Sequence, residues 1–488
     1  GLRWEQEKLE GDRDLGVGYS FTGSWGPRIG VILDPFGRRR TKLHFNFARF
    51  FQRLPNNLAQ RVFSGFAGYF DLLFWVEPDK IVRPDQAHYV GVSQCPTDFD
   101  LDGIVEGTSL GYVCVPLSLG GGRVFFPGAF FGGTGTAPRP GTKMAFQDEF
   151  GFGLKHEFTH GIVVGARYID RRLQRVTEDV NGISIEQWSS GLFILSFPMI
   201  NPSATSDQFT TPRIVPIGSE PCFPFTENVV GVGNCWSLDS GDAVPDGIAD
   251  GLPDPIREYQ AVEITFERRM QGNWQIFANW RIARLQGNFE GAFRNDNGQS
   301  DPGITSLFDF IDSPAIGDTY AVGALPNHRR HVVNAYGSYM FSQGWAEGLN
   351  LGFGLRVSTG KPLTELLAHP LFGNPGEISC NSTVTSVTDT SGQPIYNPAT
   401  SCESDGRGGN GRTPFFGTTD LHLDYPLRLS ERFRLRGVLD LFNLANARRP
   451  RARREFKEVA AGLPDPDFDT PFRFQRPFNA RFAVRLEW

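Results

Sequence analysis

The end of the chain alternates between apolar and polar side chains in the manner of a β-strand. Across residues 481–488, one face carries only large apolar groups and the other carries charged or small ones. The apolar members are Phe482, Val484, Leu486 and Trp488, and the others are Arg481, Ala483, Arg485 and Glu487. One such strand would also fit a soluble sandwich. Because the alternation recurs about a dozen times, in hairpins and with charges of both signs on the polar face, it predicts a transmembrane β-barrel.

The predicted strands follow one another in hairpins, and their polar faces form one set of candidate lumenal residues. We expect strands at residues 1–9, 25–33, 43–48, 146–158, 162–168, 261–267, 274–281, 333–339, 349–356, 420–427, 433–441 and 481–488. The lumenal candidates are Asn279, Arg281, Arg356, Asp420, His422, Asp424, Arg434, Arg436 and Asp440. The predicted fold class is therefore all-β, an antiparallel transmembrane barrel of about 12 strands.

The connections between these strands alternate between short turns and very long loops. The long loops are expected near residues 54–143, 178–255, 287–326, 360–413 and 448–472. Short turns on the periplasmic side and long loops on the extracellular side are typical of outer-membrane barrels. A compact soluble domain rarely tolerates so many long loops.

Composition agrees with a barrel and excludes two other classes of protein. The chain has 488 residues, of which 40% are hydrophobic, and no stretch approaches 18 uninterrupted apolar residues. A transmembrane helix is therefore not expected. The net charge of −6 argues against a nucleic-acid partner. The chain begins without Met or a signal peptide, so we expect that the N-terminus of a longer exported precursor is missing.

Six cysteines lie in three of the predicted loops, two in each. The pairing Cys95–Cys114, Cys222–Cys235 and Cys380–Cys402 is the only one of 15 that keeps every bridge within its own loop. Such disulfides imply an oxidising compartment. The alternative, a zinc site, lacks any C-x2-C spacing.

One loop segment resembles an EF-hand calcium loop. Asp98, Asp100, Asp102 and Glu106 occupy positions 1, 3, 5 and 9, and Gly103 occupies position 6. Position 12 is Ser109 rather than the usual bidentate Glu, so the ligand set is incomplete. A solvated acidic loop is the alternative. Calcium here would be structural, stiffening the loop between Cys95 and Cys114, and no other cofactor is required.

The run His156-Glu157-Phe158-Thr159-His160 matches the zinc-protease motif H-E-x-x-H. That chemistry needs a helix, where residues four apart share a face. The flanking residues alternate as a strand does, and two residues four apart on a strand lie about 13 Å from each other. We interpret the run as a strand end and a turn at the periplasmic rim. Since no serine or cysteine nucleophile is paired with a base, we do not expect an enzyme.

A basic cluster falls in the last predicted loop. It consists of Arg448, Arg449, Arg451, Arg453 and Arg454. Lipopolysaccharide phosphates are an available counter-charge on the cell surface, and an ordinary solvated loop is the alternative.

Several short motifs, in their order along the chain, resemble a known family. Leu441-Phe442-Asn443-Leu444-Ala445-Asn446 resembles the F-N-L-x-N signature of TonB-dependent receptors. The hairpin 257–291, the run Arg329-Arg330-His331 and the run Pro27-Arg28-Ile29-Gly30 resemble the Oar-like subgroup. The resemblance implies a 22-stranded outer-membrane barrel with an N-terminal plug. Residues 1–488 would be the C-terminal part of that barrel, with the plug, the TonB-contacting segment and the first strands absent.

Three functional hypotheses remain open at this stage. The first is a TonB-dependent receptor or transporter of the bacterial outer membrane, taking up or exporting an unidentified ligand. Its partners would be outer-membrane lipid and lipopolysaccharide, the TonB system through the missing N-terminal part, and the ligand itself. The second is a surface adhesin or structural protein, and the third is a small free-standing porin.

Overall fold

The structure of the chain is a computed structural model, and its description covers most of the predicted strands and part of the loops. The described residues are 1–10, 18–54, 141–179, 199–202, 254–299, 321–369, 375–380, 406–430 and 432–487, with the short pieces 113–114, 124–125, 138, 210–216, 228–229, 232–238, 305, 307, 387–388 and 394–396. Within these ranges no helix has the length and apolar character needed to cross a membrane.

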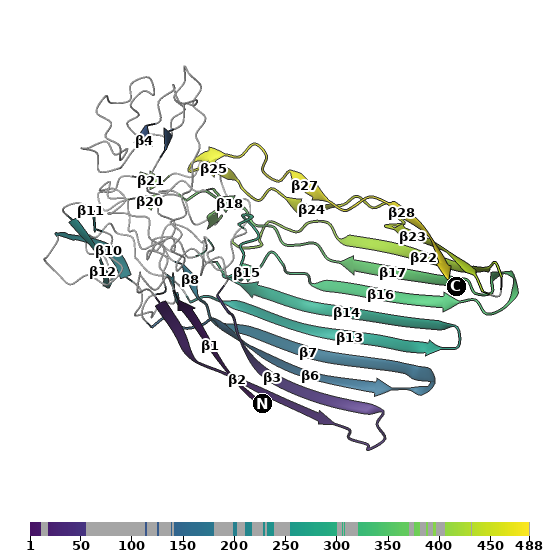
Figure 1. The fold of residues 1–488 in the computed structure, drawn as a ribbon. Helices are drawn as coiled ribbons and strands as arrows, with labels where there is room; N and C mark the ends of the chain where they lie inside the picture. The colour runs from purple at the N-terminus through teal and green to yellow at the C-terminus, as the bar shows by residue number, and fades with distance from the viewer. Residues whose placement is uncertain are drawn as a thin grey trace.

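Twelve long antiparallel strands form one sheet in which each strand pairs with its neighbour in sequence (Figure 1). They are β1 (Leu2–Glu10), β2 (Gly18–Leu33), β3 (Thr41–Phe51), β6 (Phe146–Glu157), β7 (Ile162–Arg175), β13 (Arg257–Gln271), β14 (Trp274–Gly287), β16 (His331–Met340), β17 (Asn350–Ser358), β22 (Phe416–Arg428), β23 (Arg434–Phe442) and β28 (Asn479–Glu487). All twelve overlap the strands predicted from alternation, so the predicted antiparallel architecture is confirmed. The short strand β15 (Gly323–Ala324) extends the sheet beside the end of β14.

Short turns join the strands at one end of the sheet, which we call the turn end. The turn after β2 shows why such a turn forms here. The Asp34 carboxylate accepts hydrogen bonds from the backbone N–H groups of Phe36 and Arg39, at 3.3 and 2.5 Å. Gly37 has a φ of 65°, a conformation that glycine adopts without steric cost. The local sequence therefore closes this hairpin without help from the rest of the molecule.

The two faces of the sheet differ as the alternation predicted. On one face the apolar side chains stay bare: Phe482, Val484 and Leu486 are 71, 54 and 46% exposed. Side chains of neighbouring strands pack against each other on this face. The rings of Phe45 and Phe150, for example, meet edge to face with their centroids 4.9 Å apart. Such a continuous exposed apolar surface suits hydrocarbon rather than water. We call it the outer face and the opposite one the inner face.

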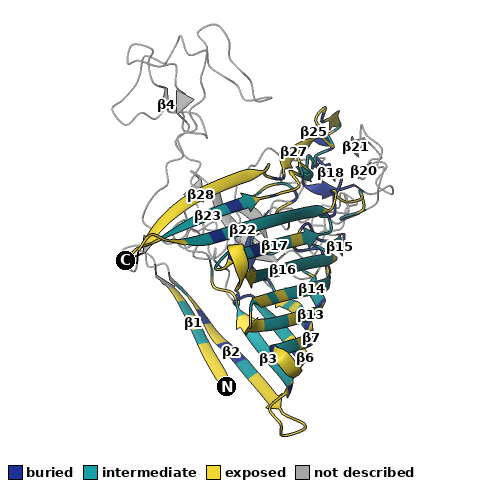
Figure 2. Ribbon diagram, turned by 90° about the vertical axis from the view of Figure 1, so that its right-hand side faces the viewer, coloured by how far each residue is buried: buried dark blue, intermediate teal, exposed yellow. Residues whose placement is uncertain are grey.

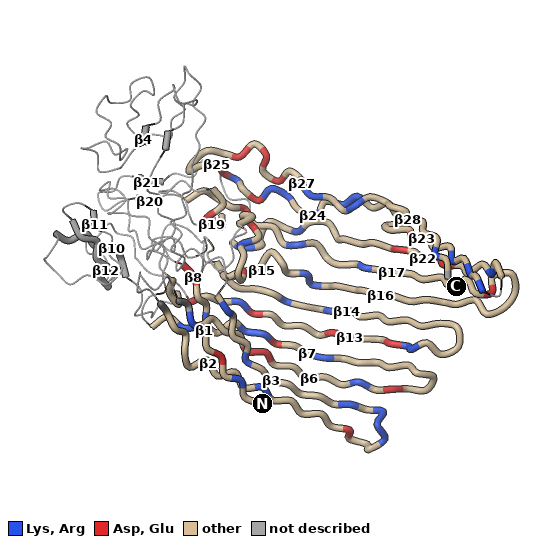
Figure 3. Tube along the Cα trace, viewed as in Figure 1, with Lys and Arg blue, Asp and Glu red and all other residues tan. Residues whose placement is uncertain are grey.

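The outer face becomes polar toward the other end of the sheet, which we call the loop end. There Arg49 pairs with Asp148 at 2.8 Å, and Arg172 pairs with Asp170 at 3.0 Å. Figure 3 shows charges of both signs along the strands. The outer ion pairs mark the limit of the apolar band on the loop side.

As far as the described residues go, the main sheet is open at both edges. In the described part of the chain, β1 pairs only with β2 and β28 pairs only with β23. Figure 2 shows the sheet curling so that these two edge strands turn toward the same side. The curl places the polar face on the inside, and a barrel could be completed by further strands between the two edges.

Smaller elements lie at the loop end or in the turns. They are β4 (Val113–Cys114) with β5 (Val124–Phe125), β8 (Glu178–Asp179) with β9 (Met199–Ile200), β10 (Thr210–Pro216) with β12 (Val232–Leu238) and β11 (Asn228–Val229), β18 (Leu366–Leu367) with β19 (Ile378–Ser379), β20 (Val387–Thr388) with β21 (Pro394–Tyr396), β24 (Pro450–Arg453) with β27 (Pro471–Phe474), β25 (Glu458–Ala460) with β26 (Leu463–Pro464), and the 3-10 turns η4 (Thr159–Gly161) and η5 (Gly344–Ala346). Many of the fully buried apolar side chains belong to these loops, among them Leu325, Leu366 and Ile378. The loops therefore have a core of their own.

Candidate functional site

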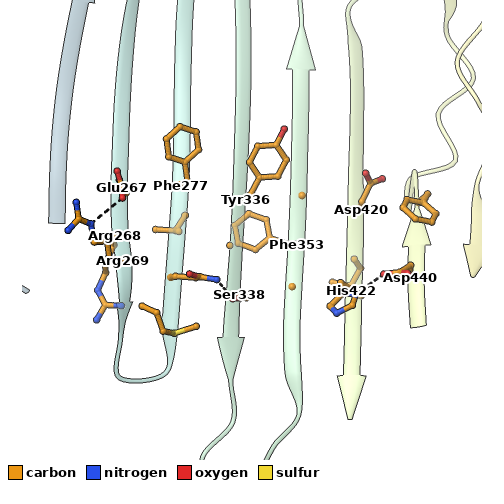
Figure 4. A pocket seen from close by; sticks show the side chains of 18 residues that line it. Glu267, Arg268, Arg269, Phe277, Tyr336, Ser338, Phe353, Asp420, His422 and Asp440 are labelled. Atoms are coloured by element: carbon orange, nitrogen blue, oxygen red, sulfur yellow. Dashed lines mark hydrogen bonds and ion pairs between the residues drawn. The ribbon is translucent and has the colours of Figure 1, made fainter. Parts of the chain in front are cut away.

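A hollow of about 620 Å³ opens on the inner face toward the turn end (Figure 4). Residues of β13, β14, β16, β17, β22 and β23 line it. Two glycines of β17, Gly352 and Gly354, lie in its wall, where they present no side chain. A methyl group added at Gly352 would come within 3.1 Å of the Cβ atom of His422. The alternation of β17 thus leaves space on the inner face while its outer face stays apolar.

An ion network runs along one side of this hollow. Nδ1 of His422 lies 2.6 Å from an Asp440 carboxylate oxygen. The Arg481 guanidinium donates to the other Asp440 oxygen at 2.6 and 2.9 Å. On the same face of β22, two residues after His422, Asp424 accepts a hydrogen bond from the Arg436 guanidinium at 2.7 Å. Adjacent strands present these groups side by side, so this side of the hollow is lined by charged groups that pair with one another.

The opposite side of the hollow is aromatic and amide-rich. Figure 4 shows Phe277 and Tyr336 side by side on neighbouring strands, above Ser338. The Gln275 amide donates to the Ser338 hydroxyl at 3.1 Å, and Arg269 lies 3.4 Å from Glu267. The predicted lumenal residues of β14, β17, β22 and β23 all lie on this inner face by register. The arrangement suits a hydrated path or a polar packing surface.

At the loop end, a buried cluster of charges joins two loops that are far apart in sequence. The Arg294 guanidinium, fully buried, donates to Asp296 at 3.0 Å and to Glu377 at 2.8 Å. The Arg407 guanidinium donates to Glu290 and to Asp296, both at 3.0 Å. This cluster ties residues 290–296 to residues 377 and 407.

Among the described side chains of this cluster, the charges balance when one of the three carboxyl groups is protonated. Burial, and then the neighbouring Asp296 carboxylate, raises the pKa of Glu290 to about 8. Burial opposes ionisation of Asp296 as well, but Arg294 and Arg407 outweigh it and hold the pKa of Asp296 below its usual value. A neutral Glu290 leaves two carboxylates facing two guanidinium groups, which is the favourable state of a buried set.

A second buried pair set ties the last loop to the same assembly. Lys361 is hydrogen-bonded to Glu455, whose other carboxylate oxygen accepts from the Thr364 backbone N–H at 2.8 Å. The Lys457 ammonium donates to Glu365 at 2.9 Å. Burial raises the pKa of Glu455 to about 7, although Lys361 acts to lower it. Three of the long loops therefore form one packed unit above the sheet.

Residues of this loop unit and of β24 and β27 line a cavity with a volume of about 1070 Å³. We call it the loop-end cavity. Seven cationic and three acidic side chains line it, together with four phenylalanines. The cations are Arg294, Arg329, Lys361, Arg451, Arg453, Arg454 and Arg473. The surplus of positive charge points to a binding site for anions.

The basic cluster predicted from the sequence contributes to this cavity. Arg451 and Arg453 lie in β24, and Arg454 follows it. Arg453 pairs with Asp469 at 2.5 Å and Arg454 pairs with Asp465 at 2.7 Å. Arg449 instead stacks over the Phe415 ring at 3.8 Å and does not line the cavity. The cluster is thus partly built into a site rather than merely solvated.

The other predicted site residues are only partly covered by the described chain. Asp98, Asp100, Asp102 and Glu106 lie outside the described residues, so the calcium loop stays a prediction. Among the cysteines, Cys380 is disulfide-bonded. Cys114 and Cys235 lie in β4 and β12, whose side chains are not described, and Cys95, Cys222 and Cys402 lie outside the described residues. The predicted pairing therefore also stays a prediction.

The H-E-x-x-H run does not form the α-helix that the zinc-protease motif requires. His156 and Glu157 end β6, and His160 lies in η4 with a φ of 61°. Nδ1 of His156 instead lies 2.8 Å from the Thr41 hydroxyl of β3. The interpretation as a strand end and turn is confirmed. No group of three or more His, Cys, Asp or Glu side chains suited to a metal occurs among the described residues.

Sequence reasoning missed the buried cluster around Arg294 and the acids Glu290, Asp296 and Glu377. Nothing in the local pattern separates these residues from an ordinary polar loop. Apart from the local pair of Arg294 and Asp296, the paired residues lie 83 to 117 positions apart in the chain. Only the folded loops reveal the cluster.

Comparison with known proteins agrees with the resemblance that the sequence predicts. The chain is 24% identical over 523 aligned residues to the TonB-dependent transporter Oar of Myxococcus xanthus, covering 99% of this chain and 40% of that protein. The chain therefore spans about 40% of the length of the curated relative that it matches. No family model matches the chain. The resemblance to an Oar-like transporter and the outer-membrane location are confirmed.

Two of the solved structures that resemble the chain are a transporter and a receptor. The FrpB iron transporter from Neisseria meningitidis (F5-1 variant, apoprotein form) has 9% sequence identity and a TM-score of 0.42, over 100% of this chain and 42% of that chain. The siderophore receptor PiuA from Acinetobacter baumannii has 9% identity and a TM-score of 0.39, over 100% and 40%.

Proposed function

We propose that residues 1–488 are the C-terminal part of the barrel of a TonB-dependent outer-membrane transporter. The observation that carries the proposal is the twelve-stranded sheet with a bare apolar outer face and a charged, internally compensated inner face. Such a sheet meets lipid on one side and water or a polar plug on the other. The similarity to Oar along nearly the whole chain supports the same conclusion.

In this proposal the loop end faces the outside of the cell and the turn end faces the periplasm. The loop unit, cross-linked by buried ion pairs, presents the loop-end cavity to the exterior. The inner-face hollow with His422 and Asp440 lies deeper, on the path that a ligand would follow. A plug and a TonB-contacting segment would be supplied by the part of the protein that precedes these residues.

The open sheet weighs against the small-porin alternative. A barrel of these twelve strands alone would require β1 to pair with β28, and no such pairing occurs among the described residues. Unpaired backbone groups at either edge would each cost several kcal/mol in hydrocarbon, on the order of the desolvation of an amide. Additional strands of a larger barrel remove that cost.

The test compares the gene's deletion with inactivation of TonB in the same organism. If the protein is a TonB-dependent transporter, the concentrations of the same set of compounds should change in the periplasm and the medium of both strains. Mass spectrometry of the two compartments would measure those changes. Changes confined to the gene deletion, with cell adhesion also lost, would favour the surface-adhesin alternative instead.

A further inference from the structure

We propose that the loop-end cavity is a binding site for a phosphate-bearing ligand, whose phosphate groups are held by Arg329, Arg451 and Arg473. The assignment rests on the proposed function only in placing the cavity on the outside of the cell.

The first observation is that these three arginines have no carboxylate partner among the described residues. In the described part of the chain, none of them forms an ion pair, whereas Arg453 and Arg454 each do. Arg329 donates only to the backbone carbonyls of Pro326 and His328, at 3.2 and 3.0 Å. The unpaired guanidinium groups retain donors that can take up an anion.

The second observation is that the cations crowd one another. Burial, together with the positive charges of Arg451 and Arg412, lowers the pKa of Arg329 to about 10. Like charges held together in a partly dry site are unfavourable unless a counter-charge is present. An anion bound among them would relieve this repulsion, which is a direct source of affinity.

The third observation is that the site is held in place before any ligand arrives. In the ladder between β24 and β27, Arg473 pairs with Ala452, and Arg451 lies at an irregularity beside that pair. An ion pair with Asp465 holds Arg454, the residue that follows β24. The Arg454 guanidinium also stacks over the Phe456 ring at 4.6 Å. A prearranged site loses less conformational entropy on binding.

Charge arithmetic favours phosphate over carboxylate. A phosphate monoester carries about −1.5 to −2 charges at pH 7, so about two such groups neutralise three arginines, whereas about three carboxylates would be needed. The planar guanidinium fork matches phosphate oxygens in pairs. The volume of about 1070 Å³ lies at the upper end for ligand pockets, so the ligand is larger than inorganic phosphate.

The phosphate could come from lipopolysaccharide or from a soluble phosphorylated molecule. The full-length protein, purified in detergent and freed of lipopolysaccharide, would be titrated calorimetrically with inorganic tripolyphosphate and, separately, with purified lipopolysaccharide. Binding of tripolyphosphate indicates a soluble source, and binding of lipopolysaccharide alone indicates a lipid source. Either result supports the phosphate site, provided that the measured binding depends on the three arginines.

The dependence is tested by variants with a matched control. The double change Arg451→Gln with Arg473→Gln should weaken phosphate binding at least tenfold. The single change Arg451→Lys should weaken binding less, because lysine keeps the positive charge and loses only the paired contacts of the planar guanidinium group. Arg448→Gln, in the same basic run but outside the cavity, should change affinity less than twofold. Heat-modified mobility on a gel would show that each barrel is folded.

Three outcomes would overturn the proposal. The protein could bind neither tripolyphosphate nor lipopolysaccharide, the Arg448→Gln control could lose as much affinity as the double variant, or a tricarboxylate of matched charge could bind equally tightly. These outcomes are separable from failure of the proposed function. Binding is measured on purified protein without TonB, so transport could persist while the site assignment falls.

Discussion

Asp296 and Arg407 lie 111 residues apart in the sequence, yet the Arg407 guanidinium donates to the Asp296 carboxylate at 3.0 Å, with both side chains fully buried. Asp296 also accepts from Arg294 at 3.0 Å. A single carboxylate therefore holds two guanidinium groups from two different loops. Removing one member of such a set leaves buried charge without compensation, which is far more costly than losing a surface ion pair.

We therefore expect Asp296→Asn to release the loop unit without unfolding the main sheet. The cost should be about 3–5 kcal/mol, because two buried guanidinium groups lose a counter-charge. Limited proteolysis should cut the variant near residues 290–299 and 406–412 much faster than the parent. Asp467→Asn removes an exposed carboxylate that has no ion pair in the described chain and should leave cleavage unchanged. Equal cleavage of both variants would contradict the role given to Asp296.

The stability of the loop unit should depend on pH through Glu290. Its pKa rises from 4.5 to about 8 on folding, so the folded form keeps a proton that the unfolded form loses. The stabilisation is complete below about pH 4.5 and is lost as the pH rises through about 8. Protease resistance of the loops should therefore fall as the pH rises from about 4.5 to about 8. The change Glu290→Gln keeps the neutral form and should flatten this dependence; an unchanged slope would show that Glu290 is not its source.

The two inner-face glycines of β17 should respond differently to the same substitution. A methyl group at Gly352 would lie 3.1 Å from Cβ of His422, which Asp440 holds in place, so Gly352→Ala should destabilise by about 1 kcal/mol. At Gly354 the nearest atom is 3.6 Å away, in Tyr336, so Gly354→Ala should stabilise by about 0.4–1 kcal/mol. Urea unfolding in lipid vesicles measures both. A common sign for the two changes would refute the packing argument.

The disulfide of Cys380 should join it to Cys402, as the loop pairing predicts. Peptide mapping without reductant should recover one linked peptide carrying both residues. Cross-links from Cys380 to any other cysteine would show that the bridges connect different loops. Loss of a bridge that closes a loop of this size typically costs about 2–4 kcal/mol, so Cys402→Ser should also speed proteolysis of this loop.

Calcium should protect the segment between Cys95 and Cys114 from protease if Asp98, Asp100, Asp102 and Glu106 bind it. Chelation should then increase cleavage in this segment, and the double change Asp98→Asn with Asp102→Asn should do so without chelator. Magnesium serves as the control cation, because it requires tighter octahedral geometry than such a loop provides. If the rate of cleavage is the same with and without calcium, the segment is a solvated acidic loop and not a calcium site.

Much of the fold could be predicted because period-2 alternation is a local signal. Each barrel strand must offer an apolar face to lipid and a polar one to water, so Phe482 and Arg481 reveal their faces without any tertiary information. The turn at Asp34 is local in the same sense. The sequence alone therefore determined the strands, their faces, the alternation of turns and loops, and the basic run at residues 448–454.

Only the tertiary structure decided which loop residues act together. Arg294, Glu377 and Arg407 belong to no periodic pattern, and along the chain they look like solvated loop charges. They become a buried cluster because the loops fold against one another over separations of 83 to 117 residues. The same folding brings Arg329 beside Arg451 in the loop-end cavity. Contacts between distant, aperiodic residues leave no mark in local sequence, which is why the site had to be found in the structure.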